Sequence, residues 1–101
     1  GKVSLAKEMF EKFISSIKKD REKILMQNND KNALLDTVHS MHGAARYCGV
    51  PRLRIQAQTT EALLNTSPNS NEQIELEIKI LIEEIDNVIN WSIEHEAIAF
   101  K

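Results

Sequence analysis

Glycine, proline, cysteine and aromatic residues are all scarce in this chain of 101 residues. Three Gly and two Pro leave few positions where regular structure must stop, so the composition favours long helices. The single cysteine, Cys48, has no partner for an internal disulfide, which fits a reducing cytoplasm. No apolar run approaches the roughly 18 residues that span a bilayer, and the first residues, GKVSLAKEMF, lack the apolar stretch of a signal peptide.

An excess of charge of one sign is also missing. Thirteen basic residues stand against 15 acidic ones, the net charge is −2, and the basic residues are interleaved with acids. The sequence therefore predicts no nucleic-acid partner and no membrane contact by this chain. A length of 101 residues favours one domain over residues 1–101. The initial Gly suggests that this domain is part of a longer protein.

Four stretches show the periodicity of amphipathic helices, with apolar residues every three or four positions. They cover residues 4–18, 34–48, 51–65 and a run of about 25 residues after position 70 that contains no Gly or Pro. Helical character can extend from the first stretch to residue 26, although the charged segment KKDREK makes a bend or break there plausible. In the third stretch, Thr60 stands where an apolar residue is expected. Short connections between four such helices predict an all-α antiparallel four-helix bundle, with room for an additional N-terminal helical segment.

The connections carry their own signals. The polar stretch QNNDKN at 27–32 reads as a loop. Gly49 is placed for a left-handed C-cap, and Pro51 suits the first turn of the next helix. Ser70 and Gln73 match a capping box ahead of the last apolar run.

The second helix carries the most informative residues. At about 100° per residue, His39 lies roughly 140° from the centre of the buried stripe, His42 roughly 80° and Gly43 roughly 180°. His39 is therefore expected in solvent, with Gly43 directly beside it at i+4. A helix-interior Gly costs about 1 kcal/mol relative to Ala, and access for a bulky partner to the imidazole is a compensating reason. Arg46 lies on the same side and can offset incoming negative charge, and Leu35 is a candidate docking contact.

These residues, by type and spacing, resemble the histidine-containing phosphotransfer (Hpt) domain. The segments VHSMHG and YCGVPRL are particularly similar to the C-terminal Hpt domains of BarA/GacS-type hybrid sensor histidine kinases, and the pattern consists of His39, Met41, His42, Gly43, Gly49, Leu53 and Glu61. The resemblance implies excision from the C-terminus of such a kinase. It also implies that the domain is a monomeric phosphocarrier without autonomous catalysis. The domain would lie in the cytoplasm, and its parent kinase in the inner membrane.

The resemblance further implies a role for each matching residue. His39 would accept a phosphoryl group from an aspartate of a receiver domain and pass it to the aspartate of a response regulator. Gly43 would provide clearance, and Glu61 would hydrogen-bond and orient the imidazole. His42 would have a supporting role, at a position where many members have a lysine that contacts the phosphoryl group or the partner. No intrinsic cofactor is implied, because Mg²⁺ is expected on the receiver.

Two alternatives stay open on the sequence alone. His39 and His42, at i and i+3, could be ligands of a metal site, but no second His/Glu pair clearly faces the same core. The chain could instead be an Hpt-like bundle that binds and modulates a receiver without transfer. Among the remaining candidates, Cys48 reads as a small core residue and His95 as a solvated residue near the C-terminus.

Overall fold

The structure is a computed structural model that describes residues 2–27, 30–66 and 71–99. These residues form four helices and no strand: α1 (Lys2–Met26), α2 (Lys31–Cys48), α3 (Pro51–Asn65) and α4 (Asn71–Ala99). The predicted all-α class and the predicted helices are confirmed. The last helix is longer than the sequence indicated, at 29 residues.

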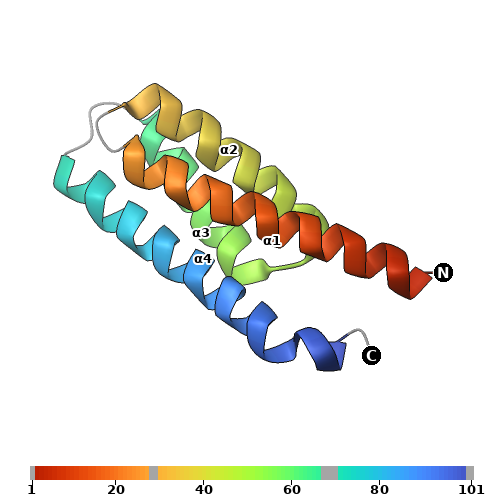
Figure 1. Ribbon diagram of the computed structural model, residues 1–101. Coiled ribbons are helices and arrows are strands. Elements are labelled where there is room, and N and C mark those ends of the chain that lie inside the picture. The colour runs from red at the N-terminus through yellow and green to blue at the C-terminus, as the bar shows by residue number, and fades with distance from the viewer. Residues whose placement is uncertain (1, 28–29, 67–70, 100–101) are drawn as a thin grey trace.

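The helices run alternately up and down, so that α1 begins and α4 ends at the same end of the molecule (Figure 1). Each helix packs against two others: α1 and α3 both contact α2 and α4. The bundle is elongated, with extents of 48 × 20 × 20 Å. The N-terminal part of α1 and the C-terminal part of α4 extend past the α2–α3 turn, so this end of the molecule is a helix pair rather than a four-helix bundle (Figure 1).

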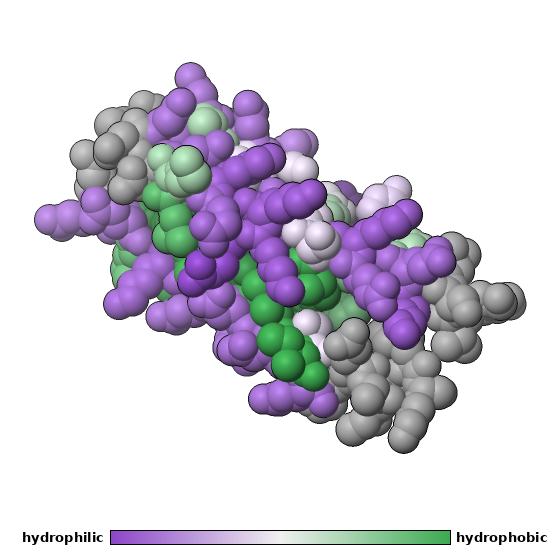
Figure 2. All heavy atoms as spheres, in the orientation of Figure 1, coloured by the Kyte–Doolittle hydropathy of each residue, from purple (hydrophilic) through white to green (hydrophobic). Residues whose placement is uncertain are grey.

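The core is made by one apolar stripe from each helix. The predicted stripe of α2 is confirmed, since Leu34, Val38, Met41 and Ala45 are buried. The buried apolar side chains of the other helices include Phe13, Ile17, Ile24, Leu53, Ala57, Leu64, Leu81 and Ile85. On the face shown in Figure 2, apolar side chains gather in a strip between α1 and α4, bordered by hydrophilic ones.

Thr60 shows how the core accepts a polar residue at an apolar position. Its side chain is only 1% exposed. The hydroxyl donates to the backbone carbonyl of Gln56 at 2.8 Å and accepts from the Gln56 amide at 3.2 Å. Because its hydrogen-bonding capacity is used within α3, Thr60 is buried without an unpaired polar atom.

The helix ends follow local chemistry. Asp30 is the N-cap of α2, and its carboxylate accepts from the backbone N–H of Ala33 at 3.0 Å. Gly49 ends α2 in the left-handed region at φ 64°, as predicted, and Pro51 is in the first turn of α3. Ser70 lies outside the described residues, so its capping box with Gln73 stays a prediction.

Of the two possibilities that the sequence left open for the first helix, the structure shows the continuous one. One continuous helix runs from residue 2 to residue 26, and the structure divides off no additional N-terminal segment within it. The buried stripe continues through the charged segment, because Asp20 and Ile24 follow Ile17 at helical spacing and are buried. Arg21, on the flank of this stripe, donates to Asp86 of α4 at 2.7 Å.

Candidate functional site

His39 projects from the middle of α2, on the side away from the core stripe. Its side chain is 77% exposed, as its helical position predicts. Packing therefore contributes little to the orientation of the ring. The ring is oriented by a hydrogen bond instead: Nδ1 of His39 lies 2.7 Å from Oε2 of Glu61, on the neighbouring helix α3. The expected pairing of these two side chains is present in the structure.

Glu61 lies between two imidazoles. Its side chain is 15% exposed, and its second oxygen, Oε1, lies 3.4 Å from Nδ1 of His42. Burial favours the protonated acid, but the hydrogen bonds and charges of His39 and His42 outweigh it and lower the pKa of Glu61 below its ordinary value. The carboxylate is therefore ionised at neutral pH and acts only as an acceptor.

This ionised carboxylate determines which ring nitrogen of His39 carries the proton. Because Glu61 can only accept, the neutral imidazole of His39 must place its proton on Nδ1 to form the bond of 2.7 Å. The lone pair then resides on Nε2, on an exposed ring. In its neutral form, the ring thus presents Nε2, its unprotonated nitrogen, to a molecule that approaches α2 from solvent.

Gly43 follows His39 by one helical turn and is exposed. A Cβ atom built at this position would have no neighbouring atom within 4 Å. Positive φ does not explain the residue either, since among the described residues only Gly49 has one. Neither packing nor backbone conformation requires a glycine at position 43. The effect that remains is the open surface that the missing side chain leaves beside His39.

The two candidate docking residues differ in their surroundings. Arg46 is exposed near the C-terminal end of α2, in the last turn where a cation also complements the helix dipole. Leu35 is half-buried and packs against the core at the opposite end of α2. Arg46 is thus exposed to solvent, whereas part of the Leu35 side chain packs against the core.

The histidine pair was also a candidate for metal binding. Among the described residues, no group of three or more His, Cys, Asp or Glu side chains is placed to hold a metal ion. The two rings instead share the Glu61 carboxylate through their Nδ1 atoms. The sequence did not predict the contact of His42 with Glu61, although its flank position on α2 is a signal that this ring faces a neighbouring helix.

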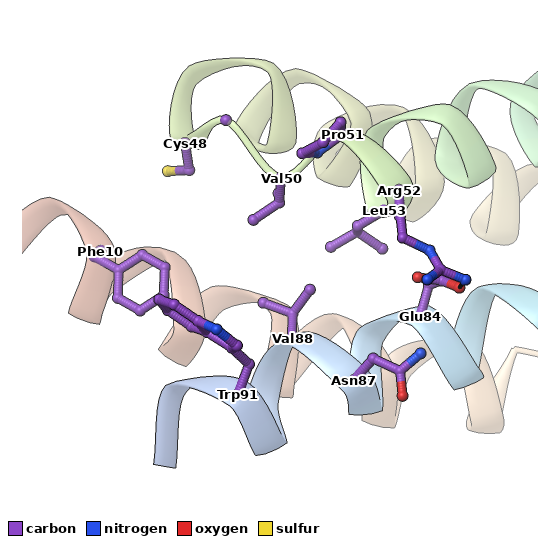
Figure 3. A pocket seen from close by; sticks show the side chains of 11 residues that line it. Phe10, Cys48, Val50, Pro51, Arg52, Leu53, Glu84, Asn87, Val88 and Trp91 are labelled. Atoms are coloured by element: carbon purple, nitrogen blue, oxygen red, sulfur yellow. Dashed lines mark ion pairs between the residues drawn. The ribbon is translucent and has the colours of Figure 1, made fainter. Parts of the chain in front are cut away.

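A separate pocket lies under the α2–α3 turn, where α1 and α4 diverge from the other two helices (Figure 3). Its volume is about 630 Å³, and it is lined by residues other than those of the histidine site. On the side opposite the turn, Phe10 of α1 and Trp91 of α4 meet edge to face, with ring centroids 5.9 Å apart. Cys48 lines the pocket as a half-buried residue, and burial raises the pKa of its thiol. Cys48 was predicted to be a core residue; it packs against the core but is only partly buried.

The site is an exposed imidazole on one helix of a four-helix bundle, hydrogen-bonded to a carboxylate of the next helix. The model of the Hpt domain family matches residues 8–91, and the chain belongs to this family. Hpt domains are phosphotransfer modules of phosphorelays, which agrees with the resemblance noted in the sequence.

Curated relatives of the chain are sensor kinases. It is 48% identical over 66 residues to the sensor histidine kinase GacS of Pseudomonas protegens, a match that covers 63% of this chain and 7% of the kinase. It is 40% identical over 77 residues to the sensor protein GacS of Pseudomonas syringae pv. syringae, covering 73% and 8%. The signal transduction histidine-protein kinase BarA of Escherichia coli K12 is 34% identical over 90 residues, covering 87% and 10%.

The chain therefore spans a tenth or less of the length of these kinases. No solved structure matches it significantly. In the described part of the chain, every helix is too short or too polar to cross a membrane.

Proposed function

We propose that His39 is a phosphoryl acceptor and donor, which takes the group from an aspartyl phosphate of a receiver domain and passes it to the aspartate of a response regulator. The observation that supports this most directly is the bond of 2.7 Å between Nδ1 of His39 and the Glu61 carboxylate. In the neutral imidazole, this bond leaves Nε2 as the unprotonated nitrogen, on a ring that is 77% exposed. An imidazole in this state is nucleophilic near neutral pH and needs no separate base.

In the accepting step, Nε2 of His39 attacks phosphorus, and the bond between phosphorus and the aspartate oxygen breaks. The electron pair leaves with the aspartate carboxylate. Nδ1 keeps its proton, so the ring becomes positively charged, and the adjacent Glu61 carboxylate offsets that charge. The same steps in reverse transfer the group to the regulator.

Positioning and charge stabilisation provide most of the catalysis of phosphoryl transfer. On this proposal the receiver contributes its acidic pocket and Mg²⁺, and the Hpt domain contributes an oriented nucleophile. Gly43 leaves room for the receiver beside His39. Arg46 and Leu35 contact the partner, and the guanidinium of Arg46 offsets negative charge near the phosphoryl group.

The relatives point to a setting for this reaction. Because GacS and BarA are sensor kinases, we propose that the chain is the phosphotransfer module of such a kinase, positioned between a receiver of that kinase and a separate response regulator. The domain would act as a monomer in the cytoplasm.

The assignment is tested by labelling with a receiver domain that carries radioactive phosphate on its aspartate. The wild-type chain, His39→Gln and His42→Gln are compared, each checked for helix content by circular dichroism. We expect no label on His39→Gln and label at an altered rate on His42→Gln. The label should be lost in acid and retained in base, as a phosphoramidate bond requires. Label that persists on His39→Gln and disappears from His42→Gln would contradict the assignment, and receiver binding without any label would favour a non-transferring module.

A further inference from the structure

The carboxylate of Glu61 is shared by two rings whose surroundings differ. His42 has a side chain that is 18% exposed, so the bundle restrains it, whereas the His39 ring is 77% exposed. Oε1 of Glu61 is 3.4 Å from Nδ1 of His42, and Oε2 is 2.7 Å from Nδ1 of His39. The three side chains form a row from the half-buried His42, through Glu61, to the exposed His39.

A glutamate side chain has three rotatable bonds, and one hydrogen bond to a mobile surface ring would leave its carboxylate with several orientations. A second donor on a restrained ring removes part of that freedom. His42 and His39 are three residues apart on α2, and both turn Nδ1 toward α3. The contact with His42 thus holds Oε1, so that Oε2 remains directed at His39.

We propose that His42 is a positioning residue for phosphorylation of His39 and that it acts through Glu61, rather than by touching the phosphoryl group. This inference rests on the proposed function. In the assigned arrangement, Nδ1–H of His42 donates to Oε1 of Glu61, which keeps the proton of His39 on Nδ1 and the lone pair on Nε2. The position is one where many Hpt domains have lysine, and here its imidazole orients the nucleophile.

Two substitutions separate this role from direct contact. The amide nitrogen of Asn occupies nearly the place of Nδ1 of His, whereas that of Gln occupies nearly the place of Nε2. His42→Asn retains a donor for Glu61, and His42→Gln moves the donor outward. Positioning through Glu61 predicts that Asn preserves function better than Gln, and direct contact of the outer nitrogen with phosphate predicts the reverse.

The first measurement is the tautomer of His39 in the unphosphorylated chain, read from the ¹⁵N shifts of the ring. We expect the Nδ1–H form to predominate in wild type and in His42→Asn, and its fraction to fall in His42→Gln and in Glu61→Ala. This readout requires no phosphoryl transfer. If the fraction is the same in wild type and His42→Gln, the positioning role is wrong, whether or not the domain transfers phosphate.

The second measurement is the rate at which phosphoramidate, a small donor that releases ammonia as its P–N bond breaks, phosphorylates Nε2 of His39. A single hydrogen bond of this kind predicts a decrease of about 2- to 10-fold in His42→Gln. The decrease should vanish when Glu61 is already Ala, because residues that act through one another are not additive. An equal decrease in both backgrounds, or rescue by Gln but not by Asn, would overturn the proposal. Failure of the receiver to label His39 while these results hold would reject the proposed function alone.

Discussion

Replacement of Gly43 separates stability from function at this site. The structure places no atom within 4 Å of a Cβ at position 43, and the residue is helical without a positive φ. Gly43→Ala should therefore introduce no clash. It should gain the helix propensity that Gly lacks, which stabilises the fold by about 1 kcal/mol. For a domain of this size, that gain raises Tm by about 4–8 °C.

The same substitution should impair transfer. We expect Gly43→Ala to slow phosphorylation by a receiver domain, and the larger Gly43→Gln to slow it by about tenfold or more, equivalent to roughly 1.4 kcal/mol in the transition state. Phosphorylation by phosphoramidate should stay near the wild-type rate in both variants, because this donor needs little space beside His39. The assays are thermal unfolding by circular dichroism and labelling with each donor.

Gly49→Ala, at the C-cap of α2, is the matched control. Gly49 has φ 64°, so Ala there is strained and should destabilise the fold by about 1–2 kcal/mol, with Tm lowered. Unchanged transfer from the receiver in Gly43→Gln would refute the clearance role. A lower Tm for Gly43→Ala would refute the conclusion that no packing requires this glycine.

Two further predictions concern the core. Asp20 is 8% exposed, and burial raises the pKa of its carboxyl, opposed in part by Lys23. The stability that protonated Asp20 contributes is therefore fully present below the ordinary pKa of 3.8 and is lost as pH rises through the higher pKa of the folded state. Asp20→Asn should be more stable than wild type at pH 7, by on the order of 1 kcal/mol, and the difference should shrink in acid. Urea unfolding at several pH values measures this, and an Asn variant that is less stable at pH 7 would contradict it. Met41 is fully buried in the α2 stripe, so Met41→Ala should lower the free energy of unfolding by about 2–5 kcal/mol, and a loss well under 1 kcal/mol in the same assay would contradict its place in the core.

The parts of the fold that follow from local rules could be predicted from sequence. The period of the apolar residues located the four helices, and the conformational needs of Gly49 and Pro51 located the α2–α3 turn. The exposure of His39 also followed from rotation about a single helix. Each of these depends on residues within a few turns of one another.

The rest depends on how helices dock. Asp20 lies in the charged segment KKDREK, where nothing in the sequence distinguishes it from its charged neighbours. Only the packing of α1 shows that it belongs to the buried stripe. The meeting of Phe10 with Trp91 joins opposite ends of the chain, and no local pattern reveals it. The contact of Glu61 with both histidines requires the register between α2 and α3. The family resemblance supplied its pairing with His39, but not its second contact with His42.

That second contact bears on how charge is distributed around the nucleophile. A lysine at position 42 would carry a flexible cation outward toward a phosphoryl group. The shorter imidazole of His42 turns its Nδ1 toward Glu61 instead. On our proposals, stabilisation of the incoming phosphate then passes to the exposed guanidinium of Arg46 and to the receiver. His42 and Glu61 act on the other side of the ring, where the proton on Nδ1 and the positive charge that forms after attack both need a carboxylate. On these proposals, the two ring nitrogens of His39 have separate roles: Nδ1 is oriented by Glu61, and Nε2 reacts with the partner.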